Sequence, residues 1–430
     1  MEKSITDRAV GTAVLNSTRV DEIEFRKLSF EDKRSYLLSM TPMEKVDLIS
    51  GDLDNKRLTR AMQPQELYWL FKEVGAPDAM ELLGMASPRQ FLFILDMELW
   101  KGWTFSEDNA IEFLGYILKR SEEHFLELLP HLDFNLLSLL LGRELIVAGG
   151  IGDLNTDEER LTDWDHTFDD VFLIKFKNPE HATIIGSFLE LVCRLDNPLY
   201  TSLLESVSGE VDIESEEECY QAKSGRLADL GFPPHHEALE IYSRINPVTF
   251  TPGRHKELLQ TVETGTLPEI FLTGKTFLER IIIRVDSELF RMELNYLINT
   301  ALVADEAHLA DVEQMKSVVE RVYGYLNIAL EYLSEDDEIK GAEILAGEYL
   351  KSLFQLGFSI ILGLKFRADK HTDSSYATGK ALSGLKSSRP LYYRGLDADA
   401  VDSYREFREM RDVKIMSDFM TVKFGNASRV

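Results

Sequence analysis

The chain has 430 residues, of which 44% are hydrophobic, so it is too long for one compact core and apolar enough to build two or three domains. Its 47 Lys and Arg residues face 74 Asp and Glu residues, which gives a formal net charge of −27. A field of that sign repels phosphate backbones and anionic lipid headgroups, so nucleic acid and membrane surfaces are excluded as expected partners.

The cysteines and the lengths of the apolar segments indicate a compartment. Cys193 and Cys219 form neither a CxxC pair nor a disulfide framework. The first twenty residues lack the apolar region of a signal peptide, and the most apolar run, 353–366, is shorter than the roughly 20 residues of a membrane span. We therefore expect a cytoplasmic protein without membrane insertion.

The N-terminal third carries a weak repeat that prolines mark. Pro42, Pro64 and Pro88 each precede a new apolar-periodic segment, in steps of 22 and 24 residues, and Pro130 follows 42 residues later. Proline suits the first position of a helix, because its φ is already helical and no hydrogen bond is lost there. Each step therefore predicts one helix and a turn, and two steps predict a helical hairpin of the size found in superhelical repeats.

Two of these helix starts also have the spacing of a capping box. In Thr41 with Glu44, and in Ser87 with Gln90, each side chain can hydrogen-bond the backbone amide of the other residue. The pattern predicts a right-handed superhelical repeat domain. A generic helical bundle with unrelated prolines is the alternative.

The middle of the chain is expected to be a linker followed by mixed structure. Residues 149–160 are polar and glycine-rich, whereas 171–176 (VFLIKF) have the β-branched and aromatic composition of a short strand. Residues 182–195 and 199–207 return to helical spacing. The acidic segment 208–225 is expected to be an exposed connection into a helix.

The C-terminal part is predicted to be helical almost to its end. Apolar residues recur at i, i+3, i+4 and i+7 over 288–305, 312–334 and 342–366. The small and polar residues of 369–390 predict a loop, and a last helix is expected within 401–420.

Together these patterns predict a mainly α fold with an N-terminal superhelical repeat domain and a C-terminal helical domain, joined by at most a short β segment. The expected boundaries are a flexible segment at 1–30, the repeat domain at 31–148, the linker and mixed segment at 149–260, and the C-terminal domain at 261–430.

Two adjacent histidines, His235 and His236, stand out in the run DLGFPPHHEALEIYSRINP at 229–247. Gly231 can end the preceding helix in the left-handed conformation, and Pro234 suits the first turn of the next helix. Adjacent helical residues point about 100° apart, whereas zinc-binding helices use histidines at i and i+4. The pair therefore predicts the start of a helix rather than a metal site.

The run DWDHTFDD gathers Asp163, Asp165, Asp169 and Asp170 around His166. Carboxylates this dense could hold Mg²⁺ or Ca²⁺. The run lacks the glycine and the closing glutamate of an EF-hand loop, so a solvated loop before a strand is the favoured interpretation. Whether the acidic loop from Asp163 to Asp170 binds a cation stays open.

Two further groups have both a structural and a functional interpretation. The predicted C-terminal loop holds a local excess of positive charge, which is either solvated or available to an anionic ligand or an acidic domain. Its basic residues are Lys365, Arg367, Lys370, Lys380, Lys386 and Arg389. Asn295 and Asn299, at i and i+4 among apolar residues, need hydrogen-bond partners when buried, and either support the fold or line a pocket.

The chain contains no nucleophile elbow, P-loop, dinucleotide fingerprint, HExxH or kinase motif. We therefore assign no catalytic residue, no metal ligand and no cofactor, and we favour a protein that is not an enzyme. Catalytic groups also assemble from distant positions, which keeps an enzyme open.

Two stretches resemble known families. The run GRLADLGFP at 225–233, with 293–305 and 352–364, is similar to a bacterial family of uncharacterised domains, and this resemblance implies no activity. The repeat over 38–140, with LDMELW at 95–100, resembles the cytosolic helical domain of MgtE-type magnesium transporters, a superhelix of short helices that regulates a channel. The second resemblance implies a fold for the N-terminal part, and the transmembrane and nucleotide-sensing parts of those transporters are not evident.

The favoured function is that of a scaffold or regulatory protein that presents a helical groove to a protein partner or to a second copy of the chain. The rival is an enzyme or small-ligand sensor with a site between the helical domains, where pockets often form. The residues expected at such a site are Arg226, Asp229, His235, Asn299 and Arg394. The rival requires that several of these side chains come within hydrogen-bond reach of one another.

Overall fold

The computed structural model describes residues 22–38, 40–75, 81–119, 122–149, 164–208, 213–253, 256, 276–285, 288–306, 312–372 and 375–425. Over these residues the fold is mainly α, as the sequence predicts, with short pairs of antiparallel strands.

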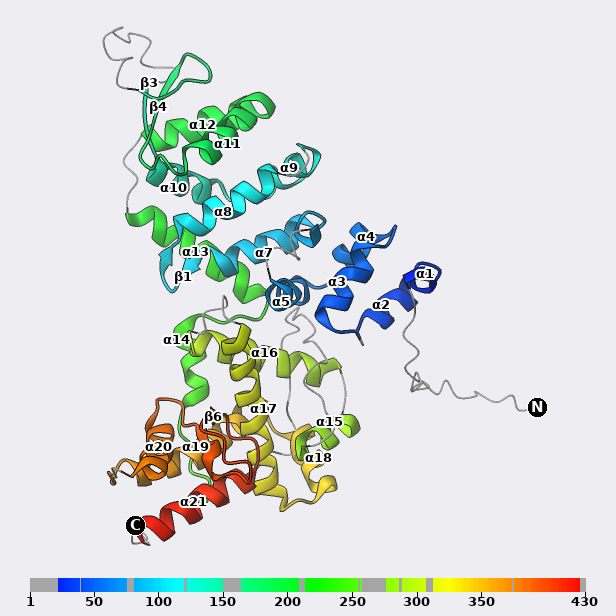
Figure 1. Ribbon diagram of the computed structural model, residues 1–430, viewed down its shortest axis with the longest axis vertical. Coiled ribbons are helices and arrows are strands. Elements are labelled where there is room, and N and C mark those ends of the chain that lie inside the picture. The colour runs from blue at the N-terminus through cyan, green and yellow to red at the C-terminus, as the bar shows by residue number, and fades with distance from the viewer. Residues whose placement is uncertain are drawn as a thin grey trace, which may run out of the picture.

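The N-terminal helices form a stack, drawn from blue to cyan in Figure 1. They are α1 (Glu22–Phe25), α2 (Phe30–Leu38), α3 (Pro42–Ser50), α4 (Asn55–Ala61), α5 (Pro64–Val74), α7 (Pro88–Glu98), α8 (Glu107–Leu118), α9 (Glu122–Leu128) and α10 (Phe134–Glu144). Pro42, Pro64 and Pro88 are the first residues of α3, α5 and α7, as the repeat predicts. Pro130 instead lies in a 3₁₀ turn, Leu129–His131, between α9 and α10. The superhelical form of the stack stays a prediction.

The capping boxes explain why two of these helices begin where they do. The Thr41 amide donates to the Glu44 carboxylate at 3.1 Å, and the Gln90 amide donates to Ser87 Oγ at 3.3 Å. These bonds satisfy backbone groups that have no partner within the first turn of a helix. The predicted helix starts of α3 and α7 are therefore confirmed.

The described residues contain three antiparallel strand pairs: β1 (Trp100–Lys101) with β2 (Thr104–Phe105), β3 (Leu145–Gly149) with β4 (Phe172–Phe176), and β5 (Tyr392–Tyr393) with β6 (Tyr404–Arg405). β4 confirms the strand expected at 171–176. Gly149 ends β3 with φ of 84°, and a Cβ there would lie 2.4 Å from the Val171 carbonyl oxygen, so the position requires glycine. The rest of the predicted linker, 150–160, lies outside the described residues.

Three helices from the middle of the chain extend the N-terminal stack: α11 (Ala182–Leu195), α12 (Asn197–Ser208) and α13 (Ile213–Asp229). They pack against α8 and α10, and Figure 1 shows them in green beside those helices. The sequence predicts an exposed connection over 208–225, and this is wrong from residue 213 onward. Helix α13 forms there because Cys219 and Leu227 are buried against the stack.

The run with the two histidines begins the crossing to the C-terminal half. Gly231 has φ of 85°, and His235 is the first residue of α14 (His235–Ala238), which continues as a 3₁₀ turn, Leu239–Tyr242. The expected helix start is confirmed.

The C-terminal half is a helical bundle around α17 (Val312–Ser334) and α19 (Leu350–Ala368), drawn from yellow-green to red in Figure 1. The other elements are α15 (Phe277–Val285), α16 (Glu288–Ala304), α18 (Glu338–Gly347), α20 (Tyr376–Lys386), a 3₁₀ turn at Arg394–Leu396 and α21 (Met410–Phe424). The backbones of α17 and α19 approach closely, because a Cβ on Gly357 would lie 2.1 Å from the Tyr325 carbonyl oxygen.

The loop expected at 369–390 is corrected by α20. Its small residues pack rather than loosen the chain: Ala381 and Leu385 are fully buried, and a Cβ on Gly384 would lie 2.9 Å from the Leu391 carbonyl oxygen. The last predicted helix starts later than expected, at Met410, because Tyr404 and Arg405 form strand β6.

The two halves meet where α5 faces α16. Gln65 Nε2 on α5 donates to Asn299 Oδ1 on α16 at 2.6 Å, and both residues are buried. Figure 1 shows the N-terminal stack above the C-terminal bundle, with α5, α14 and α16 at the junction. The expected domain boundaries stay a prediction.

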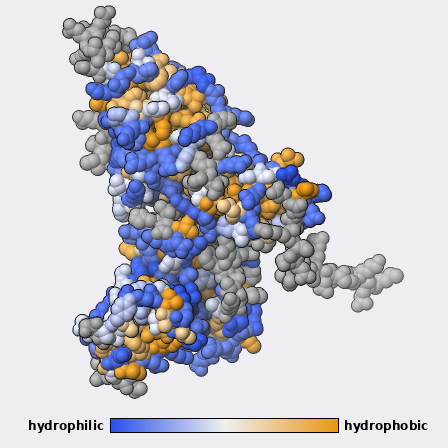
Figure 2. Space-filling model, viewed as in Figure 1, coloured by the Kyte–Doolittle hydropathy of each residue, from blue (hydrophilic) through white to orange (hydrophobic). Residues whose placement is uncertain are grey.

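Figure 2 shows hydrophilic residues over most of one face, with apolar residues gathered over the upper stack and at its α1–α4 end. Within the described residues, no single helix has the length and apolarity to cross a membrane. One bent pair, Glu122–His131 with Phe134–Glu144 at 107°, has both properties when its two helices are taken together.

Candidate functional site

One face of α13 lies along the N-terminal stack. Glu216, Tyr220, Lys223 and Arg226 follow one another at spacings of four, three and three residues, which places them on the same side of a helix. We call Trp103, Tyr220, Lys223 and Arg226 the α13 strip, because Trp103 of the β1–β2 hairpin packs on this face.

The hairpin is fixed to α13 at the N-terminal end of this face. The Phe105 amide donates to Glu216 Oε1 at 2.8 Å, and Arg143 pairs with both Glu216 and, at 2.6 Å, Glu107. Because Gly102 takes a positive φ of 62° in the hairpin turn, Trp103 stands at the hairpin tip.

In the middle of the strip, the Lys223 amine lies against the aromatic rings of Trp100 and Tyr220. The Tyr220 ring centroid lies 4.6 Å from that of Trp103 and 5.4 Å from that of Trp100. The Lys223 ammonium lies 5.1 Å from the Tyr220 centroid and 5.4 Å from the Trp100 centroid. Within the described residues, Lys223 makes no hydrogen bond or ion pair with a carboxylate, and burial lowers its pKa to about 8.

The C-terminal end of the strip is an ion-pair cluster. Arg226 donates to both oxygens of Asp96, at 2.8 and 2.7 Å, and to Asp133 at 3.1 Å. The side chain of Asp96 is 5% exposed and that of Arg226 is 34% exposed. The hydrogen bonds with Asp96 raise the pKa of the guanidinium, so Arg226 stays charged.

An apolar cavity of about 40 Å³ adjoins this cluster. Asp96, Asp133 and Arg226 line one side of it. The other lining residues are apolar and come mainly from α7, α8 and α10: Leu92, Leu95, Leu99, Phe105, Ala110, Phe113, Leu114, Ile117, Leu132, Leu136, Leu137 and Leu140. A single water needs about 10–15 Å³, so the cavity has room for one small apolar side chain. The arrangement thus offers a partly exposed amine, an exposed tryptophan and a small apolar space side by side.

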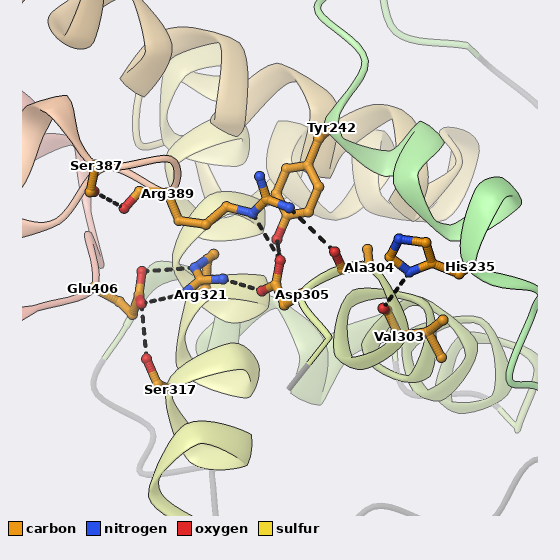
Figure 3. Close-up of polar contacts among 10 residues, drawn as sticks. All are labelled: His235, Tyr242, Val303, Ala304, Asp305, Ser317, Arg321, Ser387, Arg389 and Glu406. Carbon is orange, nitrogen blue, oxygen red and sulfur yellow. Dashed lines mark hydrogen bonds and ion pairs between the residues drawn. The ribbon is translucent and has the colours of Figure 1, made fainter. Parts of the chain in front are cut away.

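Within the described residues, no hydrogen bond or ion pair joins any two of the five residues expected at a ligand site. Arg226 belongs to the α13 strip, whereas Asp229 is exposed at the end of α13. Arg394 is an exposed residue of the C-terminal half that pairs with Asp399 at 3.0 Å. His235 Nδ1 lies 3.1 Å from the Val303 carbonyl oxygen, as Figure 3 shows. The contacts of these residues therefore do not show the convergence that the rival function requires, and the ligand site stays a prediction.

Asn299, the remaining member, lies in the contact between the halves. Asn299 accepts a hydrogen bond from Gln65. Asn295, one turn earlier on α16, also contacts Gln65, because its Nδ2 donates to Gln65 Oε1 at 3.5 Å. Asn295 Oδ1 and Asn299 Nδ2 are buried and have no hydrogen-bond partner among the described residues. The two asparagines therefore connect α16 to α5, which is the structural interpretation of the pair.

A second charged cluster lies inside the C-terminal half, and Figure 3 shows it. Arg321 on α17 donates to Glu406 at 3.1 and 2.7 Å and pairs with Asp305. Arg389 Nε and Tyr242 Oη both donate to Asp305 Oδ1 at 2.8 Å. We call Tyr242, Asp305, Arg321, Arg389 and Glu406 the Arg321 network.

The centre of the Arg321 network is nearly excluded from solvent, whereas the Arg389 side chain at its edge is 25% exposed. The Arg321 side chain is 9% exposed and the Glu406 side chain is 2% exposed. The Arg389 guanidinium stacks over the Tyr242 ring at 3.5 Å. Each charged group has a partner of opposite charge, so the network joins five chain segments rather than offering a free group to a ligand.

Residues 22–422 match a sequence family described as a family of unknown function, DUF6178. The chain belongs to this family. The expected resemblance to an uncharacterised family is thereby confirmed. No curated protein and no solved structure matches the chain. The resemblance of 38–140 to the MgtE-type helical domain stays a prediction.

The acidic loop of this DUF6178 chain supports its own backbone. Asp169 Oδ1 accepts from the Val171 and Phe172 amides at 3.0 Å, and Asp165 Oδ2 accepts from the Phe176 amide at 2.9 Å. Asp163 lies outside the described residues. Across the part of the chain that the structure describes, no group of three or more His, Cys, Asp or Glu side chains could hold a metal ion.

Sequence reasoning missed most residues of both clusters in the DUF6178 chain. The spacing of Tyr220, Lys223 and Arg226 marks one helical face, a signal that the acidic composition of 208–225 concealed. Arg321 stands among Val318, Val319 and Val322 on the apolar side of α17, which indicates a buried charge.

Proposed function

We propose that this DUF6178 chain is a cytoplasmic scaffold or regulatory protein whose N-terminal stack binds a protein partner through the α13 strip. The observation that carries the proposal is Trp103, which is 58% exposed at a hairpin tip and packs against the Tyr220 ring. Tryptophan, tyrosine and arginine supply most of the binding energy at protein interfaces. All three residue types occur in the α13 strip.

The chemistry of the strip indicates the chemistry of the partner. Lys223 has no carboxylate bound to it within the described residues, so an acidic side chain of the partner can pair with its ammonium. The cavity beside Asp96 and Arg226 has room for one small apolar side chain. A helical segment with an acidic residue and an apolar residue on one face fits both features.

The free thiols of Cys193 and Cys219 support a cytoplasmic location. The resemblance of 38–140 to a helical domain that regulates a channel supports a regulatory role. A second copy of the chain is the alternative partner.

The proposal is tested by selecting peptides from a displayed library of random helices against the full-length chain. We expect the selected peptides to share an acidic and a small apolar residue on one face. Trp103→Ala should weaken their binding about tenfold or more, as for a central interface residue, and Lys223→Gln should weaken it less. Tyr376→Ala, at a 67% exposed aromatic residue of the C-terminal half, is the control and should change nothing.

Peptides that bind the Trp103→Ala and Lys223→Gln chains as tightly as the unaltered chain would rule out this surface. Thermal unfolding of both variants checks that they are folded. Sedimentation of the unaltered and Trp103→Ala chains tests the second copy: a dimer that Trp103→Ala dissociates identifies the chain itself as the partner.

A further inference from the structure

An open cleft between α2 and α4, at the N-terminal end of the stack, gathers positively charged side chains. It has a volume of about 600 Å³ and is lined by Phe30 of α2 and by Lys56, Arg57, Arg60 and Ala61 of α4. Sites for small molecules are typically about 300–1,000 Å³. In Figure 1, α2 and α4 lie on the opposite side of the stack from α13, and Figure 2 shows hydrophilic and apolar residues side by side there.

The cations of this cleft outnumber the carboxylates that pair with them. Lys56 and Arg60 share one carboxylate, Glu127, at 3.3 and 2.6 Å. Within the described residues, Arg57 makes no hydrogen bond or ion pair, and its guanidinium lies 3.9 Å from the Phe30 ring centroid. The cleft therefore keeps an excess of positive charge in a chain whose formal net charge is −27.

The cleft has two parts: the Arg57 guanidinium over the Phe30 ring, and the cationic pair Lys56 and Arg60. The Arg57 guanidinium is planar and exposed and lies over the Phe30 ring, and aromatic bases stack on guanidinium planes of this kind. Arg60 is held in place by donating through Nε to the Met85 carbonyl oxygen at 3.1 Å. Lys56 and Arg60 lie one turn apart on α4, so both head groups face the same side.

We propose that this cleft binds a mononucleotide, whose base stacks on the Arg57 guanidinium and whose phosphates pair with Lys56 and Arg60. A longer nucleic acid fits less well, because each added phosphate meets an acidic surface. The proposal is independent of the α13 strip, so either one can fail alone.

The first test compares three probes by calorimetry with the full-length chain: ATP, adenosine and inorganic tripolyphosphate. We expect ATP to bind about tenfold or more tightly than either of the others, because only ATP carries both the base and the phosphates. Tripolyphosphate binding as tight as ATP binding would reduce the site to an adventitious anion site and overturn the proposal. An absence of ATP binding, or tighter binding of a single-stranded oligonucleotide, would also overturn it.

The second test uses two variants with opposite expected effects. Arg57→Gln removes the stacked cation and should weaken ATP binding about fivefold or more. Glu127→Gln should strengthen it severalfold, because it frees Lys56 and Arg60 from the carboxylate that competes with phosphate. Lys340→Gln, at an exposed lysine on α18, removes one positive charge as Arg57→Gln does and is the charge-matched control for that variant.

Both variants should stay folded with only a small change in unfolding temperature, since Arg57 is exposed and the ion pairs of Glu127 are partly exposed. The proposed nucleotide site is contradicted if Glu127→Gln weakens ATP binding. It is also contradicted if Arg57→Gln leaves ATP binding unchanged.

Discussion

The α13 strip and the Arg321 network use the same kinds of side chain in opposite ways. In the network, Arg321 is bound by Asp305 and Glu406, and these charges are nearly excluded from solvent. In the strip, Trp103 is largely exposed, and Lys223 is surrounded by aromatic rings without a carboxylate bound to it in the described structure.

This difference separates groups that hold the fold from groups that are free to bind. Breaking a buried, fully paired charge cluster leaves an uncompensated charge, so its members are tied to stability. A partly buried amine without a carboxylate partner makes folding less favourable, and such groups are characteristic of functional sites. The comparison predicts large losses of stability at the network and small ones at the strip.

The largest effect is expected for Arg321→Met. This change keeps most of the side-chain volume but leaves Asp305 and Glu406 without their shared cation. The free energy of unfolding should fall by about 3–5 kcal/mol, as measured for broken buried ion pairs. Urea denaturation of the two full-length chains measures the difference.

Arg394→Met is the matched control, because Arg394 forms an ion pair with Asp399 at an exposed position. An exposed pair contributes about 0–1 kcal/mol. Equal losses for the two arginine variants would show that the Arg321 network does not stabilise the fold as its burial implies.

An intermediate effect is expected at the junction between the halves. Gln65→Leu leaves Asn299 Oδ1 buried without its donor, which should cost about 1–3 kcal/mol. Adding Asn299→Leu removes the unsatisfied group, so the double variant should lose less stability than the sum of the single variants. A double-mutant cycle by denaturation measures this coupling, and strict additivity would argue against a direct bond between the halves.

The sequence predicts the parts of the fold that depend on neighbouring residues. Pro42, Pro64 and Pro88 each favour a helix start through the backbone of their own first turn. The composition of 171–176 by itself favours a strand. The start of α14 at His235 follows from Gly231 for the same reason.

The candidate site and the junction between the halves could not be predicted, because their contacts join distant residues. Arg226 and Asp96 are 130 positions apart, and Gln65 and Asn299 are 234 apart, so no local pattern pairs them. The helix α20 was missed because small residues permit both loops and close helix packing, and only the burial of Ala381 and Leu385 distinguishes the two. Of the residues expected at a ligand site, the α13 strip contains Arg226.

The smallest effect concerns the stability contribution of Lys223. Burial lowers the pKa of its ammonium from 10.5 to about 8, so between these pH values the unfolded chain binds a proton that the folded chain lacks. The free energy of unfolding should therefore rise with pH across this interval, relative to Lys223→Met, by about 1 kcal/mol for a partly exposed group. Denaturation of both chains at a series of pH values measures the difference, and Lys101→Met, on the neighbouring strand β1, controls for the loss of a lysine. If the difference in the free energy of unfolding between the unaltered and Lys223→Met chains does not change with pH, the amine is fully hydrated. Lys223 would then not be the desolvated lysine that we infer for the α13 strip.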